Sequence, residues 1–217
     1  MFGKQAVRLA LIAPHLDALA EKVDAVYTGS GSYAGYEFPV SLGGTSMRLM
    51  SANYYDTYAF ASSDSRLALQ NQKGYGTAYP HAHGKLTGTA IFTTGGTCLL
   101  AAYYYDSHGR TVQRRVQNHL GGHEEEYTVY SFTGQPLQRK QVHAAPAQPI
   151  RTHVITHTYD HLDRPLTTSL DGRPIAETAY DELGRVERVR HYGHDMRYAY
   201  NVRDWTTAIG GTRSTYA

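Results

Sequence analysis

The sequence predicts a mainly β protein made of antiparallel hairpins in one coiled, open sheet, with one short helix near the N-terminus. Three observations lead to this fold class. The 217 residues include 19 Tyr and 21 Gly, a composition that favours short strands and turns over long helices. Short apolar runs alternate with turn sequences along most of the chain. One motif also recurs every 20 to 29 residues, which indicates a repeat architecture.

The recurring motif consists of a Tyr-Asp pair, two variable residues, a turn residue and an Arg. Full copies begin at Tyr105, Tyr159 and Tyr180, and degenerate copies begin at Tyr130 and Tyr200. Successive tyrosines of this set are separated by 25, 29, 21 and 20 residues. We assign a structural role in the repeat to the following positions: Tyr105, Asp106, Gly109, Arg110, Tyr130, Gly134, Tyr159, Asp160, Arg164, Tyr180, Asp181, Gly184, Arg185, Tyr200 and Trp205.

Each position of the motif has a physical role in a hairpin turn. The Asp carboxylate can accept the backbone N–H two residues ahead, and the Gly adopts a positive φ that other residues resist. The Arg opens the next strand, where it can reach the Asp and lie over a Tyr ring. The Tyr is expected to stack on the ring of the next repeat. If that ring is buried, Tyr180→Ala should cost about 3–5 kcal/mol, and Gly184→Val should strain the turn.

The N-terminal part is predicted to differ from the repeats. Residues 14–26 follow a helical period after a Pro at the first position, which predicts a helix that covers a sheet edge. The glycine-rich stretch 27–44 is expected to form a loop, because its glycine spacing does not match a dinucleotide-binding fingerprint. Residues 47–55 are the next predicted strand. The polar residues 62–79 are expected to form a surface excursion.

From there the sequence predicts a meander of hairpins. Turns are expected at 121–122, 171–172 and 193–195, and Arg114 and Arg115 are expected to point outward from their strand. The chain is divided into an N-terminal segment (1–53), a lead-in hairpin region (54–97) and a repeat segment (98–217). The predicted strands cover residues 86–93, 97–105, 111–118, 127–132, 136–143, 153–159, 165–170, 175–180, 186–192 and 196–200.

Composition and charge exclude several classes of protein. The 21 basic and 19 acidic residues give a formal charge of +2, so no nucleic-acid partner is expected. Cys98 is the one cysteine, which excludes an internal disulfide, and its apolar surroundings favour a buried, inert thiol. The sequence shows neither a convincing signal peptide nor an apolar run long enough for a membrane span.

We expect neither enzymatic activity nor a cofactor or metal. Four histidine pairs are present, at 81/83, 119/123, 153/157 and 191/194. On one strand, side chains four residues apart stand about 13 Å from each other, too far to share a zinc ion. His81 and His83 could chelate an ion from one strand face, but no third ligand is evident. Asp106, Asp160 and Asp181 could act as the paired carboxylates of a glycosidase. Their recurrence at the start of each turn favours a structural role instead.

The motif resembles the YD repeats of the RHS (rearrangement hotspot) family. Further resemblance lies in Tyr-Tyr-Asp at 54–56, Gly-Lys-Leu-Thr-Gly-Thr at 84–89, Asn-His-Leu-Gly-Gly at 118–122, Phe-Thr-Gly-Gln-Pro at 132–136, and residues 160–165 and 198–205. The resemblance covers residues 54–209 and is closest to RHS proteins of the Bacteroides type.

This resemblance implies a spiral of β-hairpins that forms a hollow shell on a large secreted or cell-surface protein, often with a variable toxin at its end. The chain is expected to be an interior segment, whose partners are the flanking repeats of a longer chain and an enclosed toxin domain. An alternative remains open. Exposed Tyr and His side chains could form a surface module that binds carbohydrate or protein.

Overall fold

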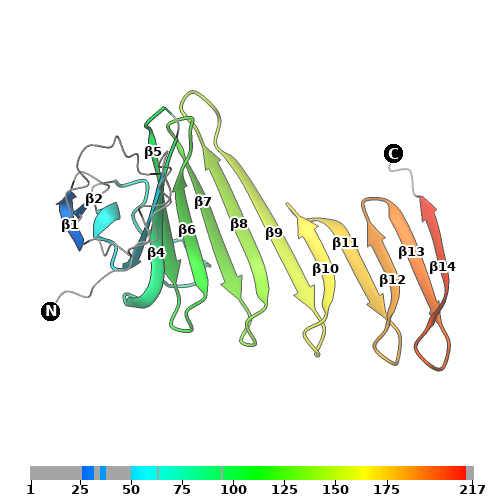
Figure 1. Cartoon of the computed structure of the whole chain (residues 1–217). Coiled ribbons are helices and arrows are strands. Elements are labelled where there is room, and N and C mark those ends of the chain that lie inside the picture. The colour runs from blue at the N-terminus through cyan, green and yellow to red at the C-terminus, as the bar shows by residue number, and fades with distance from the viewer. Residues whose placement is uncertain (1–25, 32–34, 38–49, 63, 94, 214–217) are drawn as a thin grey trace, which may run out of the picture. The chain divides into compact units, whose positions relative to one another are not determined.

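The computed structural model describes residues 26–31, 35–37, 50–62, 64–93 and 95–213. Among these residues, two strands form a small sheet and twelve form a larger one (Figure 1). In the small sheet, β1 (Val26–Gly31) pairs antiparallel with β2 (Gly35–Glu37). In the larger sheet the strands follow chain order from β3 to β14. The predicted mainly β class and its antiparallel hairpins are confirmed.

The strands of the larger sheet coincide closely with the predicted apolar runs. Only the last strand lies where no strand was predicted, in the glycine-containing C-terminal stretch. The bounds are β3 (Ser51–Asp56), β4 (Ala82–Phe92), β5 (Cys98–Tyr105), β6 (Thr111–Gln117), β7 (His123–Tyr130), β8 (Pro136–Ala144), β9 (Arg151–Tyr159), β10 (Pro165–Leu170), β11 (Arg173–Tyr180), β12 (Val186–His191), β13 (His194–Tyr200) and β14 (Thr206–Arg213).

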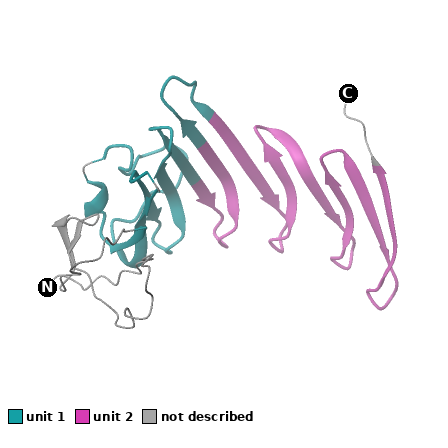
Figure 2. Cartoon of the chain, turned by 45° about the horizontal axis from the view of Figure 1, so that its top comes forward, with its two compact units in different colours: residues 1–127, 142–151 teal, residues 128–141, 152–217 magenta. Residues whose placement is uncertain are grey.

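The chain forms two compact units (Figure 2). Unit 1 comprises Met1–Tyr127 and Val142–Arg151, and unit 2 comprises Thr128–Gln141 and Thr152–Ala217. Among the described residues, the buried hydrophobic side chains all belong to unit 1. Unit 2 is built of hairpins whose side chains are mostly half-buried or exposed. The division predicted from the sequence, at residues 53 and 97, stays a prediction.

The core of unit 1 lies between the sheet and the segment of residues 57–81, which connects β3 to β4. Ala61, in the short 3-10 helix η2 (Ala59–Ala61), and Leu67 pack against Ala102 and Tyr104 of β5. Tyr58 also stacks on Tyr104, with ring centroids 4.6 Å apart. The prediction that residues 62–79 form a mere surface excursion is therefore wrong. Its few apolar residues follow no period, so the sequence gives no sign that they cover a sheet.

Other predictions for the N-terminal part have different outcomes. The loop predicted at 27–44 is wrong in part, because β1 and β2 pair there. The helix predicted at 14–26 lies outside the described residues, except for Val26, which begins β1. None of the described residues belongs to a helix that is long and apolar enough to cross a membrane.

Candidate functional site

Seven turns among the described residues share one hydrogen-bonded geometry. In each, the first residue donates its N–H to the carbonyl of the fifth, and the fourth donates its N–H to the carbonyl of the first. The fourth residue has a positive φ in every case, between 59° and 98°. The predicted left-handed glycines are thus confirmed at Gly109, Gly134 and Gly184. One of the turns runs from Thr93 to Thr97, and the others span residues 106–110, 118–122, 131–135, 160–164, 181–185 and 201–205.

In the full copies of the motif, the Asp holds the turn together as predicted. Asp181 Oδ1 accepts the N–H of Leu183 at 3.0 Å and that of Arg185 at 2.8 Å. Its Oδ2 pairs with Arg185 Nε at 2.7 Å. Partial burial raises the pKa of Asp181, but the N–H donors and the guanidinium outweigh it, so the pKa lies below its ordinary value. Asp106 with Arg110 and Asp160 with Arg164 repeat these contacts.

Each of these arginines in unit 2 also reaches the tyrosine of the next repeat. The guanidinium of Arg164 lies over the ring of Tyr180, 4.3 Å from its centroid, and that of Arg185 lies over Tyr200 at 4.9 Å. The Tyr180 hydroxyl donates to the carbonyl of Pro165 at 3.1 Å. Each tyrosine thus has a guanidinium over its ring, and its hydroxyl donates to the carbonyl of the residue that follows that arginine. We call this pair of contacts the turn-to-turn link.

The predicted stacking of ring on ring is wrong at Tyr180 and Tyr200. These residues end β11 and β13, so a complete strand separates them. Strands lie about 4.8 Å apart, which places such rings about 10 Å from each other. Aromatic pairs need centroids within about 7 Å. An extended Arg side chain spans this gap, so the guanidinium is the neighbour of the ring.

The degenerate copies keep part of the turn-to-turn link. The Tyr159 hydroxyl donates to the carbonyl of Pro136 at 3.0 Å, although Gln135 stands where Arg would be. In the same turn, Ser131 takes the place of Asp and accepts the N–H of Gln135 at 2.9 Å. Trp205 occupies the Arg position of the last turn, where it is 65% exposed. These positions therefore keep the backbone geometry and lose the ion pair.

Sequence reasoning missed one copy of the repeat, because a long insertion divides it. Asp56 Oδ1 accepts the N–H of Gly84, which lies 28 positions further on, at 2.5 Å. The Tyr105 hydroxyl then donates to the carbonyl of Leu86 at 2.6 Å, and Lys85 Nζ lies 6.0 Å from the Tyr105 centroid. Tyr-Asp at 55–56 and Gly-Lys at 84–85 are the two parts of this copy in the sequence. Adjacent, they would be recognised as the motif.

Gly184→Ala is expected to lower the free energy of unfolding by about 1–2 kcal/mol, because a Cβ is strained at φ +82°. That Cβ would also stand 2.6 Å from Arg164 Nη1, so the guanidinium must shift from its place over the ring of Tyr180. Gly172→Ala is the control, since it has φ +80° and an open space around its Cβ. Urea unfolding should show that Gly184→Ala lowers the free energy of unfolding by about 0.5–1 kcal/mol more than Gly172→Ala does. The idea fails if this difference survives in an Arg164→Ala background.

Tyr180→Ala is expected to cost about 1–2 kcal/mol, less than the loss expected for a buried ring. The side chain is half-buried, so the substitution removes one hydrogen bond and one cation–π contact and leaves no closed cavity. Tyr180→Phe should retain the cation–π contact and lose only about 0.5–1.5 kcal/mol. Chemical denaturation of the two variants tests this order. Equal losses would show that the ring face contributes nothing.

A buried polar network in unit 1 overturns another prediction. Arg115 was expected to point outward, but it is 3% exposed. Its Nη1 pairs with Glu125 Oε1 at 2.9 Å, and its Nε donates to the carbonyl of Arg66 at 2.6 Å. Neighbouring residues of a strand face opposite sides, so Arg114 and Arg115 cannot both point outward. The segment of residues 57–81 covers the side on which Arg115 lies.

The carboxylate of this network is held in its charged form. Burial raises the pKa of Glu125, but the Tyr127 hydroxyl, Arg115 and His123 outweigh it, and the pKa lies below its ordinary value. Burial and the hydrogen bond to Glu125 raise the pKa of Tyr127 to about 12. The Tyr127 hydroxyl therefore stays protonated and donates to Glu125 Oε2 at 2.6 Å.

Asp64 is expected to make the stability of unit 1 sensitive to acid. Its hydrogen bond to Arg66 lowers the pKa of Asp64 from 3.8 to about 2. A lowered folded-state pKa contributes stability that is present above about pH 4 and is lost as the pH falls towards 2. We expect a loss on the order of 1 kcal/mol after solvent screening. Urea unfolding between pH 5 and 2 should show this slope for the native chain, and a flatter one for Asp64→Asn.

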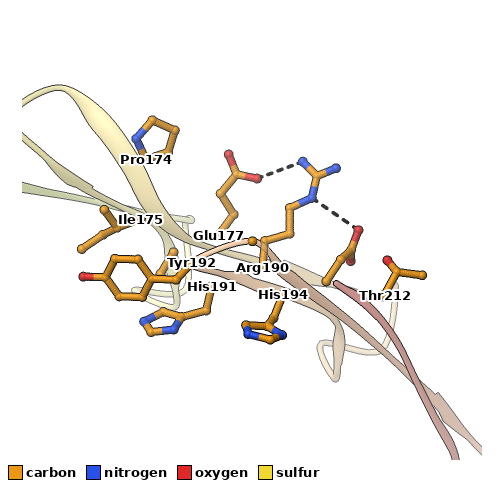
Figure 3. Close-up of a pocket in the computed structure, with 11 residues that line it drawn as sticks. Pro174, Ile175, Glu177, Arg190, His191, Tyr192, His194 and Thr212 are labelled. Carbon is orange, nitrogen blue, oxygen red and sulfur yellow. Dashed lines mark hydrogen bonds and ion pairs between the residues drawn. The ribbon is translucent and has the colours of Figure 1, made fainter. Parts of the chain in front are cut away.

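The hairpin of β12 and β13 borders a hollow of about 450 Å³ in unit 2 (Figure 3). On one side of the hairpin, Arg190 pairs with Glu177 at 3.2 Å and with Asp195 at 3.6 Å. His191 and His194 lie on the other side. The turn predicted at 193–195 is shifted, because Tyr192 and Gly193 form it. In the described part of the chain, no group of three or more His, Cys, Asp or Glu residues is placed to hold a metal.

Comparisons with known proteins give fold similarity alone. No family model matches the sequence, and no curated protein matches it. The chain is similar to one in the crystal structure of TcdB2-TccC3-Cdc42 (TM-score 0.46, 14% identity) and to one in that of TcdB2-TccC3 (TM-score 0.43, 14% identity), over 84% of its length. A chain of TcdB2-TccC3 without its hypervariable C-terminal region is similar over 82%, with TM-score 0.42 and 13% identity. This chain covers 10% of the length of each of the three.

Proposed function

We propose that the chain is a non-catalytic structural segment of a larger RHS/YD-repeat protein of the Bacteroides type. Its hairpins form part of a spiral β-shell that encloses or presents a toxin or other cargo, outside the cell or at its surface. The observation that carries this proposal is the turn-to-turn link. It passes from Arg164 to Tyr180 and from Arg185 to Tyr200, always from one repeat to the next along the chain.

A contact that recurs in this way supports a structural role. Each repeat supplies the cation and the carbonyl for the next one, so further repeats can be added by the same contacts. The motif carboxylates also suit structure better than catalysis. A general acid needs a raised pKa, whereas the pKa values of Asp106, Asp160 and Asp181 are lowered: burial raises them, and the Arg and N–H donors outweigh it.

One observation favours the alternative, a surface that binds carbohydrate or protein. The turns of unit 2 expose apolar side chains to solvent, and such surfaces often mark interaction sites. We call this set the apolar turn row. It consists of Phe132, Leu162, Leu183, Val202 and Trp205, which are between 62% and 104% exposed.

Tyrosine nitration separates the two functions. If the chain is a shell segment, Tyr105, Tyr159 and Tyr200 should react slowly, because their hydroxyls bind backbone carbonyls. Tyr79 and Tyr192, which are 47% and 63% exposed, should react quickly. Arg185→Ala should accelerate the nitration of Tyr200 and leave Tyr105 unchanged. Equal reactivity of all these tyrosines would contradict the role as a shell segment.

The fluorescence of Trp205 tests the alternative directly, since it is the one Trp of the chain and belongs to the apolar turn row. A panel of glycans should leave its emission unchanged if the chain is a shell segment. A saturable shift with one glycan, abolished by Leu183→Ala, would establish the binding surface instead. In the longer protein, protection of a cargo segment from protease, lost on Arg164→Ala with Arg185→Ala, tests enclosure.

A further inference from the structure

His191 and His194 face each other across the tightest part of the β12–β13 hairpin. They are register partners in the antiparallel pair, and the two residues between them, Tyr192 and Gly193, have φ of 44° and 79°. Positive φ at both central positions is typical of a type I′ turn, which places the flanking residues directly opposite each other. The sequence predicted His191 in a strand and His194 within the turn that follows it. The turn places them on adjacent strands.

Directly opposed residues of an antiparallel pair project from the same face, with Cβ atoms about 4.5–5.5 Å apart. Figure 3 shows both imidazole rings on one side of the hairpin, and Glu177 and Arg190 on the other. Both histidines are exposed to solvent, so an ion can approach them freely. Nitrogen–metal bonds are about 2.0–2.1 Å long. Two imidazoles that start this close can therefore bind the same ion, which histidines 13 Å apart on one strand cannot.

We propose that His191 and His194 form a two-histidine chelate for a divalent late transition-metal ion, with Cu²⁺ bound most tightly. Neutral imidazole suits Cu, Ni and Zn, and affinity rises along this part of the first row to Cu²⁺. Calcium and magnesium need several oxygen ligands. The nearby carboxylates of Glu177 and Asp195 are turned away and paired with Arg190. Water fills the remaining coordination positions, so the bound ion keeps room for an external ligand.

Tyr192 is a second observation that points to this face. A type I′ turn usually has Asn, Asp or Gly at its first central position, as the two-residue turn between β10 and β11 has Asp171 with φ 50°. Tyr192 adopts this conformation against its preference, and strain of this kind clusters at functional sites. Its ring packs edge-on against His191, with centroids 4.5 Å apart and planes at 83°. This contact restricts the rotamers of His191 and holds its ring on the chelating face.

The test is a Cu²⁺ titration of the full-length, untagged chain against a chelator of known affinity. The native chain should bind one tight equivalent, and electron paramagnetic resonance should show two coordinated nitrogens. His191→Gln and His194→Gln should each weaken this site about 100-fold, because the second ligand binds intramolecularly, and should leave one nitrogen. His153→Gln is the matched control. His153 is exposed, lies in the same unit and pairs with Asp171 at 2.8 Å.

Tyr192→Asn separates the turn from the chelate. It keeps both histidines and suits the turn, so the urea midpoint without metal should not fall, while the Cu²⁺ affinity should drop several-fold. The proposal is overturned if His153→Gln weakens the tight site as much as His191→Gln does. It is also overturned if the resonance spectrum of the native chain shows one nitrogen. Circular dichroism without metal verifies that each variant is folded.

Discussion

Arg115→Ala is expected to lower the free energy of unfolding by about 3–5 kcal/mol, the largest loss we predict for a charged residue. The Arg115 side chain is 4% exposed and that of Glu125 is 16% exposed. Removal of the guanidinium leaves the carboxylate of Glu125 without its cation in a largely dry environment. The carbonyl of Arg66 also loses its donor. Urea unfolding followed by circular dichroism measures the loss.

Arg114→Ala is the matched control, because Arg114 is the neighbouring residue on the opposite face of β6 and is half-buried. We expect it to cost about 0.5 kcal/mol. A double variant, Arg115→Leu with Glu125→Leu, should recover much of the loss, since replacing both members of a buried pair by apolar residues leaves no orphaned charge. If Arg115→Ala costs no more than Arg114→Ala, the network does not hold unit 1 together.

The parts of the fold that the sequence predicts are those made by local contacts. Asp181 and Arg185 are four residues apart, and the N–H groups that the Asp binds lie in the same turn. The chemistry of Asp, Gly and Arg is therefore visible in the sequence itself. Most strands follow for the same reason, because they are apolar runs bounded by short turns. The positive φ of Gly184 can therefore be predicted from the turn sequence alone.

The parts that the sequence does not predict depend on distant residues or on register. Leu67 and Tyr104 are 37 positions apart, and no periodic pattern connects them. The neighbour of the Tyr180 ring depends on the strand spacing, which admits an Arg side chain and excludes a second ring. For His191 and His194, a shift of one residue in the turn decides whether they face each other. Register of this kind follows from the turn geometry.

Leu67→Ala is expected to lower the free energy of unfolding by about 2–5 kcal/mol, because it opens a cavity in the core of unit 1. Leu67 is 0% exposed and packs with Ala61, Ala102 and Tyr104. Its backbone carbonyl also accepts the Tyr104 hydroxyl at 2.7 Å. The smaller side chain should loosen the segment of residues 57–81 from the sheet. Urea unfolding and limited proteolysis of this segment measure the two effects.

Leu69→Ala provides the control, since Leu69 belongs to the same segment, two residues further on, and is 48% exposed. It should cost at most about 0.5 kcal/mol. Tyrosine titration gives an independent readout, because burial raises the pKa of Tyr58 and of Tyr104. If the segment detaches in Leu67→Ala, both tyrosines should ionise nearer their ordinary pKa, and in Leu69→Ala they should not. Identical titration curves and equal stability for the two variants would mean that residues 57–81 do not form the core of unit 1.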